Sequence, residues 1–233
     1  CKLYGESKIV DFGNLKEAHD PKALREKVDE IYRQLVLPFS NHSKDLKGIH
    51  RIYADVACKY VKAILDHDQT YCGGIYIEAL EKEFTCNYTF GESKTNVTFK
   101  LIIDRVDRLG GKNGLLRIVD YKTGSDKSSF TDWGQIFSDP KLKGVSQLFL
   151  YSLLISQSKQ YGNKEKIQPA LYVLPEIMKN RGEYSPLITI GRRGSKSEKT
   201  VEDFTIAENI NPYTERLDAV LKEIFRSEEP IVQ

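Results

Sequence analysis

The 233-residue chain has few cysteines and no long apolar run. Its four cysteines, Cys1, Cys58, Cys72 and Cys86, include no pair at the close spacing of a zinc or iron–sulfur site. We interpret them as the reduced thiols of a cytoplasmic protein, and a pairing of Cys72 with Cys86 is the alternative. No apolar segment approaches the roughly 20 residues of a membrane-spanning helix, so the sequence predicts no membrane partner.

The chain also lacks a strong net charge and a low-complexity tract. Its formal net charge is +2 at pH 7, so the field of the whole molecule does not indicate a nucleic-acid partner, and local basic patches would have to hold one. The sequence begins at Cys1 and contains a single methionine, from which we expect a piece of a longer polypeptide. Because we find no internal repeat and no linker, we expect residues 1–233 to form one domain.

What the chain does have is clear hydrophobic periodicity, which changes between the helical period and a period of two. Asp20 followed by Pro21 is a typical helix start, so we expect the first helix to begin there and to run to about Leu37. Further helices are predicted at 46–65, 145–160 and 212–225. Strands are predicted at 75–90, 97–106, 115–121, 167–174 and 187–190, the first three forming an antiparallel meander, and a long loop at 123–143.

In the second predicted helix, apolar residues form a stripe along one side. Its members are Ile49, Tyr53, Val56, Tyr60 and Ile64. Such a stripe predicts that this side of the helix faces the core, with Lys59 and Lys62 outside.

Two consecutive strands carry charges inside apolar runs: LIIDRVD at 101–107 and LRIVDYKTG at 116–124. Asp120 and Lys122 are two residues apart, so they lie on the strand face that Leu116 and Ile118 also occupy. Charges on such a face are unfavourable unless a metal or a partner compensates them. The alternative is a surface ion pair at a strand end, which has little energetic consequence.

A second carboxylate, Asp104, lies one strand earlier, so the pattern predicts a divalent-metal site. Mg²⁺ prefers oxygen ligands and keeps several waters, and we expect Asp104, Asp120 and the carbonyl of Tyr121 to hold Mg²⁺ or Mn²⁺. Lys122 would orient the attacking water or stabilise charge on the phosphate. This chemistry indicates hydrolysis of a phosphodiester.

The same residues resemble the central motifs of the PD-(D/E)XK nuclease superfamily, specifically its RecB/AddB-like branch, which reads G-x-x-D-R-x-D followed by D-Y-K-T/S-G. The segment QLFLY matches the Q-x-x-x-Y motif of that branch, which implies that Gln147 and Tyr151 lie against the active site. A buried polar pair in a helix packed on the sheet is the alternative for these two residues. The resemblance departs from the family pattern at Leu101, where the family has glycine.

The resemblance implies an α/β fold with a restriction-endonuclease-like α-β-β-β-α-β core, in which helices flank a central mixed sheet. It further implies a Mg²⁺-dependent DNA nuclease of the exonuclease type. Such a domain lies at the C-terminus of an AddB-like helicase-nuclease subunit and acts on single-stranded ends in double-strand-break repair and recombination.

The first motif of the family, a His or Glu on an N-terminal helix, has no unambiguous counterpart. His19, Glu30 and His50 are candidates that the sequence does not rank, and each has a solvated side chain as its alternative. A second hypothesis therefore stays open, in which the chain is a catalytically inactive nuclease-fold module that binds DNA or anchors a complex.

Basic and aromatic residues near these motifs predict nucleic-acid contacts. Phosphate contacts need local positive charge, and unpaired bases stack on aromatic rings. The alternatives are solvated charges and core aromatics. The candidates are Arg105, Lys127, Arg192 and Arg193 for phosphates, and Phe130 and Trp133 for bases.

Overall fold

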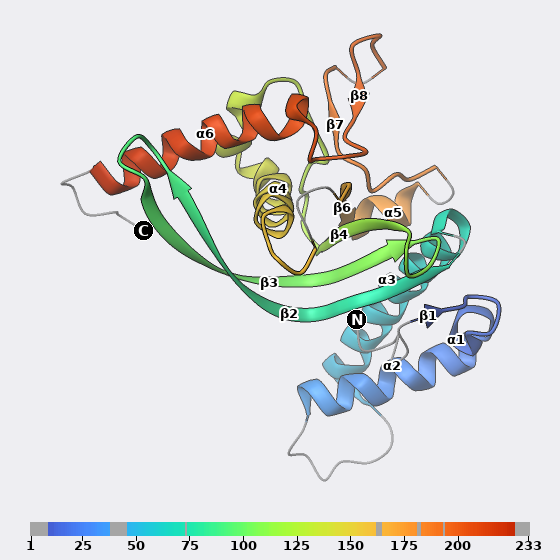
Figure 1. Ribbon diagram of the computed structural model, residues 1–233. Helices are drawn as coiled ribbons and strands as arrows, with labels where there is room; N and C mark the ends of the chain where they lie inside the picture. The colour runs from blue at the N-terminus through green and yellow to red at the C-terminus, as the bar shows by residue number, and fades with distance from the viewer. Residues whose placement is uncertain are drawn as a thin grey trace.

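The computed structural model describes residues 9–37, 46–72, 74–161, 165–180, 183–192 and 194–226, except for the side chains of residues 71, 72 and 226. It has the predicted mixed α/β architecture: a curled five-stranded sheet with helices on both faces, as in a restriction-endonuclease-like core (Figure 1). No helix within these ranges is long and apolar enough to cross a membrane. Cys58 and Cys86 are free thiols.

The main sheet has the strand order β1-β2-β3-β4-β6. The predicted antiparallel meander is confirmed, because β2 pairs with β3 and β3 with β4 in antiparallel fashion. β6 is parallel to β4, since the connection between them crosses over through helix α4. The strands are β1 (Ile9–Val10), β2 (Ile75–Phe90), β3 (Thr95–Leu109), β4 (Leu115–Lys122) and β6 (Ile167–Val173).

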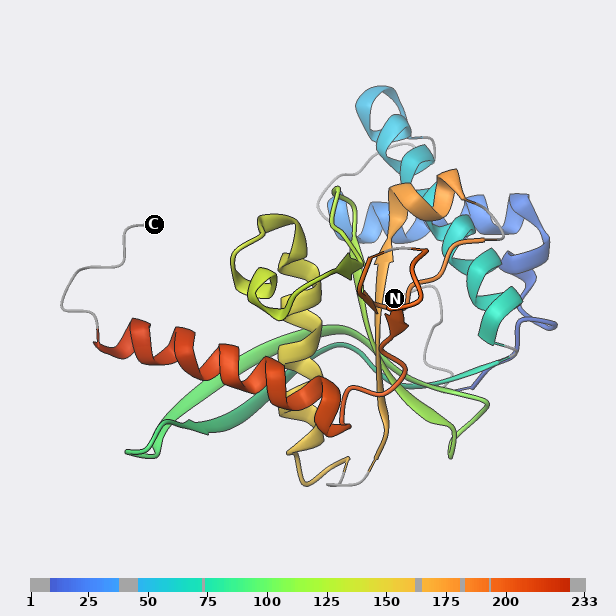
Figure 2. The same ribbon diagram turned by 90° about the horizontal axis from the view of Figure 1, so that it is seen from above.

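Helices cover the sheet in two layers. Figure 2 shows α4 and α6 over the long β2–β3 hairpin, while α2, α3 and α5 lie toward the other end of the molecule. A second sheet of three short strands, β5-β7-β8, lies apart from the main one. The remaining elements are α1 (Lys16–His19), α2 (Pro21–Val36), α3 (Gly48–Cys72), α4 (Lys143–Ser156), α5 (Leu174–Lys179), α6 (Ala207–Arg226), β5 (Ser129–Phe130), β7 (Thr189–Ile190), β8 (Lys199–Thr200) and the 3-10 helices η2 (Trp133–Phe137) and η3 (Pro140–Leu142).

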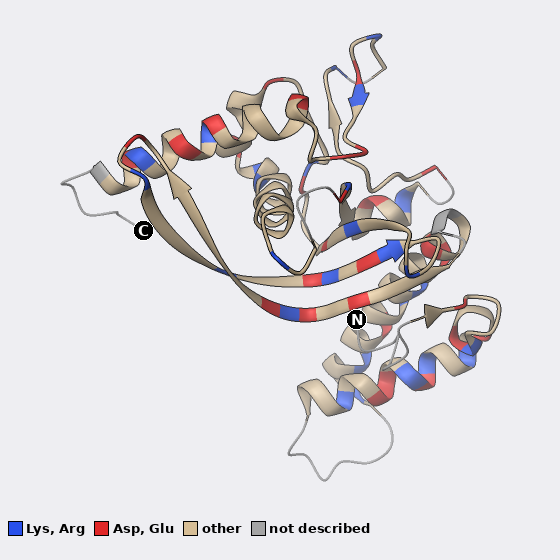
Figure 3. Ribbon diagram, viewed as in Figure 1, with Lys and Arg blue, Asp and Glu red and all other residues tan. Residues whose placement is uncertain are grey.

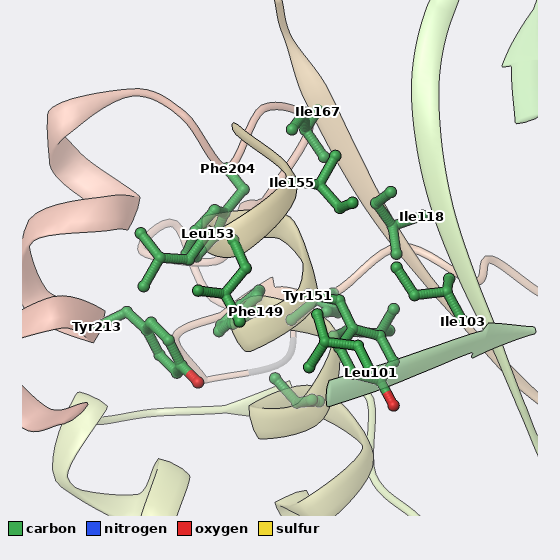
Figure 4. Close-up of a cluster of buried hydrophobic side chains, with 14 of the residues drawn as sticks. Leu101, Ile103, Ile118, Phe149, Tyr151, Leu153, Ile155, Ile167, Phe204 and Tyr213 are labelled. Carbon is green, nitrogen blue, oxygen red and sulfur yellow. The ribbon is translucent and has the colours of Figure 1, made fainter. Parts of the chain in front are cut away.

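The largest hydrophobic core lies between α4 and one face of the sheet, and Figure 4 shows its centre. Helix α4 is apolar on most sides because the sheet, η2 and Tyr213 of α6 all pack against it. The core members labelled in Figure 4 are Leu101, Ile103, Ile118, Phe149, Tyr151, Leu153, Ile155, Ile167, Phe204 and Tyr213.

Strand β3 changes which of its residues face this core. Leu101, Ile103 and Val106 all belong to the core under α4, so the inward positions shift by one residue between Ile103 and Val106. On the paired strand, Glu81 has a φ of +48°, and the register of the β2–β3 pair shifts between Ile77 and Ala79, as at a β-bulge. Because the inward positions of β3 shift, Arg105 turns to the opposite face of the sheet instead of entering the apolar core.

The apolar stripe predicted on the second helix is only partly correct. Ile49, Tyr53 and Val56 are 51%, 55% and 42% exposed. The first half of α3 packs against α2 rather than the sheet, and its contact side there includes Ala57 and Cys58. The stripe residues of this half therefore face solvent.

Several element bounds also differ from the sequence prediction. Helix α3 continues past residue 65 to Cys72, and α6 begins at Ala207, before the proline at which its start was predicted. The expected loop at 123–143 contains β5 and two 3-10 helices, capped by the side chains of Asp132 and Asp139. Asp–Xaa turns and short 3-10 segments produce no periodic pattern, so periodicity did not reveal them.

Candidate active site

The two carboxylates of the predicted site lie on neighbouring strands. β3 pairs with β4 through Arg105↔Val119, so the next position of the ladder brings Asp104 opposite Asp120. The backbone N–H of Tyr121 donates a hydrogen bond to Oδ2 of Asp104 at 2.9 Å. This contact holds the Asp104 carboxylate at the end of β4, beside Asp120.

Lys122 joins this pair of carboxylates to helix α4. Its Nζ lies 2.8 Å from Oδ2 of Asp120 and donates a hydrogen bond to Oε1 of Gln147 at 2.9 Å. Gln147 in turn donates through Nε2 to the hydroxyl of Tyr151. A continuous polar chain therefore runs from β4 to α4, and Gln147 and Tyr151 are more than an isolated buried pair.

Burial distinguishes this ion pair from an ordinary surface pair. Asp120 is 3% exposed, whereas the side chain of Lys122 retains 23% of its accessible surface. Burial raises the pKa of Asp120 to about 6, against the lowering effect of Lys122; the negative charges of Asp104 and Asp126 raise it further. Burial also raises the pKa of Tyr151. The site thus concentrates negative charge where water is largely excluded.

Asp126 and Gly144 belong to the surroundings of the site, and the sequence motifs did not indicate them. A Cβ atom at Gly144 would lie 3.2 Å from Oδ1 of Asp126, 3.2 Å from Cε of Lys122 and 3.0 Å from Cδ1 of Leu171. Glycine at this position lets the first turn of α4 approach the end of β4. The only sequence signal was a glycine at the start of a predicted helix, which is too common to identify a site.

The donor set suits a hard divalent cation. Asp104 and Asp120 supply carboxylate oxygens, and the carbonyl of Tyr121 follows directly after Asp120 along β4. After burial, the negative charges of Asp104 and Asp126 raise the pKa of Asp120, and a bound cation would neutralise these charges. No group of three or more His, Cys, Asp or Glu side chains suited to a metal occurs in the described ranges. Mg²⁺ usually keeps several waters in addition to one or two carboxylates.

The prediction that Arg105 contacts nucleic acid is wrong. Arg105 is 0% exposed and lies on the opposite face of the sheet from Asp104. Its Nη1 donates to Oδ2 of Asp68 on α3 at 2.7 Å, and its Nε lies 2.8 Å from Oδ2 of Asp107. The second and fourth residues of the D-R-x-D segment therefore form an internal ion-pair cluster.

The other predicted nucleic-acid contacts have different surroundings. Lys127 is half exposed and pairs with Asp139 at 2.8 Å. Arg192 is exposed, and Arg193 lies outside the described residues. Figure 3 shows basic and acidic residues interspersed on most elements, in keeping with the small net charge. Phe130 is 3% exposed, so the prediction that it stacks on bases is wrong, whereas Trp133 is partly exposed.

The three first-motif candidates lie in the N-terminal helices α1, α2 and α3. His19 contacts the carbonyl of Phe12, Glu30 pairs with Lys27, and His50 contacts the hydroxyl of Tyr32. Each of these contacts is with another N-terminal residue and none is with the two aspartates. The described structure therefore does not single out a first-motif ligand.

A comparison with protein families finds a match over most of the chain. The family model described as the PD-(D/E)XK nuclease superfamily matches residues 4–232. No curated protein matches the chain. The matched range contains both carboxylates, Lys122 and the Gln147–Tyr151 pair, and covers nearly the whole chain.

Proposed function

Because the chain belongs to the PD-(D/E)XK nuclease superfamily, we propose that it hydrolyses DNA phosphodiester bonds at the Asp104/Asp120 site with Mg²⁺ or Mn²⁺. The observation that carries this proposal is the buried Asp120–Lys122 pair, which lies beside Asp104 at the end of β4. A charged pair of this kind is unfavourable in a core and useful in a hydrolytic site.

Each residue of the site has a distinct role in this proposal. Asp104, Asp120 and the Tyr121 carbonyl hold the cation. The cation supplies Lewis-acid polarisation of the phosphoryl oxygen and a lowered pKa for a water molecule. Lys122, partly exposed, orients the attacking water or stabilises the negative charge that develops on the phosphate.

Gln147 and Tyr151 act through Lys122. Oε1 of Gln147 accepts a hydrogen bond from Lys122, and Tyr151 holds the Gln147 amide in place. The ammonium group is therefore fixed between β4 and α4 before substrate arrives. Fixed donors stabilise a transition state better than mobile ones, because little reorganisation is needed during the reaction.

The resemblance of residues 101–107, 116–124 and 147–151 to the RecB/AddB-like branch supports a finer proposal. In it, the chain is the nuclease domain of a cytoplasmic helicase-nuclease, taken from a longer polypeptide. It degrades single-stranded ends that a helicase partner delivers during double-strand-break repair and recombination.

A catalytically inactive module is the second candidate function. It is favoured by one observation: within the described ranges, no third metal-ligating side chain is grouped with Asp104 and Asp120. Such a module would bind DNA or anchor a complex without cleaving, and it would bind Mn²⁺ weakly or not at all.

A cleavage assay on end-labelled single-stranded DNA with Mg²⁺ tests the leading proposal. We expect Asp120→Ala and Lys122→Ala each to lower the cleavage rate by roughly 10²-fold or more, because each removes a group that acts on the developing charge or on the cation. Circular dichroism should show that both variants stay folded. Lys112→Ala, which removes the same charge from an exposed turn, should cleave normally. Undiminished Mg²⁺-dependent cleavage by both site variants would contradict the assignment.

A further inference from the structure

A groove of about 510 Å³ lies between the small three-stranded sheet, η2 and the start of α6. Three features of its lining bear on what it binds: the indole of Trp133, the basic residues Arg192 and Lys199, and polar groups that include Asn209. A volume of this size is typical of a small-ligand site and accommodates one nucleotide unit. We call it the Trp133 groove.

The indole of Trp133 is held rigidly from behind. Its ring centroid lies 5.1 Å from that of Phe130 and 5.7 Å from that of Phe149. Both phenylalanines are buried, at 3% and 0% exposure, so they form a fixed support. The part of the indole that remains accessible lines the groove. A ring fixed in this way loses little entropy when another flat ring stacks on it.

Positive charge lies on the rim of the groove. Arg192 is exposed, and none of the described acidic side chains forms an ion pair with its guanidinium. Lys199, on the strand β8 that is blue in Figure 3, pairs with Glu208 while its side chain stays 69% exposed. An exposed guanidinium without an acidic partner is well suited to bind a phosphate.

The segment between Lys122 and Trp133 connects the proposed catalytic site to this groove, and hydrogen bonds hold part of it to β7. After Lys122, the chain enters β5 and reaches Trp133 at the start of η2. The carbonyl of Ser128 accepts from the N–H of Thr189 at 3.0 Å, and the carbonyl of Phe130 accepts from the N–H of Gly191 at 2.8 Å. These hydrogen bonds tie β5 to β7 and so hold the two sides of the groove together.

We propose that the Trp133 groove binds an unpaired base of the nucleic-acid strand, with the base stacked on Trp133 and Arg192 on an adjacent phosphate. The inference rests on the proposed nuclease function and names the single-stranded part of its substrate. A base within a duplex is already stacked on both faces, so only an unpaired base can use the indole. An apolar peptide would gain nothing from Arg192.

The chain offers a direct probe, because Trp133 is its only tryptophan. The experiment titrates the full chain, in EDTA so that no cleavage occurs, with oligothymidylate and with an abasic oligonucleotide of the same length. We expect oligothymidylate to quench the fluorescence. The abasic strand should bind at least about 5-fold more weakly and cause little quenching, since base–aromatic stacking is lost.

Two variants complete the test. Arg192→Ala should weaken oligothymidylate binding several-fold, whereas Lys112→Ala, which removes one positive charge from a distant turn, should not. Equal quenching by the abasic strand, no quenching by either strand, or unchanged binding by Arg192→Ala would overturn the proposal. A chain that quenches without cleaving would refute only the catalytic assignment, and one that cleaves without quenching would refute only the groove.

Discussion

At the scale of single residues, Asp120 is well placed to hold a cation, but its buried carboxylate lowers the stability of the metal-free fold. Its carboxylate is 3% exposed, close to a second carboxylate, and has a pKa raised to about 6. The ionised form that would hold a cation is therefore unfavourable in the metal-free protein. Residues that serve a reaction often lower the stability of the fold in this way.

This opposition predicts a specific pH dependence. The pKa of Asp120 rises from 3.8 to about 6 on folding, so between these values the folded state binds more protons than the unfolded state. The contribution of Asp120 to the free energy of unfolding therefore falls as the pH rises from about 4 to about 6, then levels off. Asp120→Asn should remove this decline and be more stable than the wild type at pH 7.5 without metal, by on the order of 1–3 kcal/mol.

Denaturant unfolding across this pH range, in EDTA, measures the effect. Asp66→Asn is the matched control, because Asp66 is a carboxylate on α3 in a surface pair with Lys62. An Asp120→Asn variant that is less stable than the wild type at pH 7.5 would show that the ionised Asp120 does not destabilise the metal-free fold.

The sequence predicted the site residues that lie on strands but not the one that lies in a loop. Asp104, Asp120 and Lys122 interrupt apolar runs at a period of two, so their common location follows from strand geometry. Asp126 lies in a loop, where no period constrains direction, and only the folded chain brings it near. The same period places Arg105 on the face opposite its neighbour Asp104, and Arg105 was misassigned because periodicity does not show that Asp68 of α3 covers that face and buries the guanidinium.

At the scale of the elements, strands β3 and β4 have opposite chemistry on their two faces. One face carries the catalytic candidates, and the other carries a buried ion-pair cluster that also involves α3. Arg117 makes two hydrogen bonds of 2.9 Å to Asp107, and the hydroxyl of Tyr172 donates to Asp68 at 2.6 Å. The nearby guanidiniums of Arg105 and Arg117 hold the pKa of Asp68 well below its usual range, against the effect of burial.

Breaking this cluster should destabilise the fold much more than breaking a surface pair on the same helix. Asp68→Ala leaves buried guanidiniums without their partner and should lower the free energy of unfolding by about 3–5 kcal/mol. Asp66→Ala, two residues earlier on α3, removes a half-exposed partner of Lys62 and should lower it by less than about 1 kcal/mol. Urea unfolding of the two variants makes the comparison, and similar losses in both would refute the structural role of the cluster.

For the helices too, hydrophobic periodicity predicts where an element lies but not which neighbour packs against it. Helix α2 was predicted well, because a capping aspartate and a following proline mark its start. The apolar stripe of α3 indicates a buried face, yet its first half faces solvent, since a helix pattern does not say which neighbour covers each part. Tertiary packing decides that point.

At the scale of the whole molecule, the sheet separates the proposed catalytic site from the buried ion-pair cluster. The face toward α4 holds the carboxylates and Lys122, and the small sheet beyond it holds the Trp133 groove. The face toward α3 carries the ion pairs that fix the same strands from behind. In this account the substrate strand lies on the α4 side only.

An isothermal titration of the metal-free chain with Mn²⁺ tests whether Asp104 and Asp120 form a metal site. We predict that the wild type binds Mn²⁺ with measurable heat, that Asp104→Ala and Asp120→Ala each lose this binding, and that Lys112→Ala retains it. A wild type that binds no Mn²⁺ under conditions where it is folded, or aspartate variants that bind as the wild type does, would contradict the central claim that Asp104 and Asp120 form a metal site.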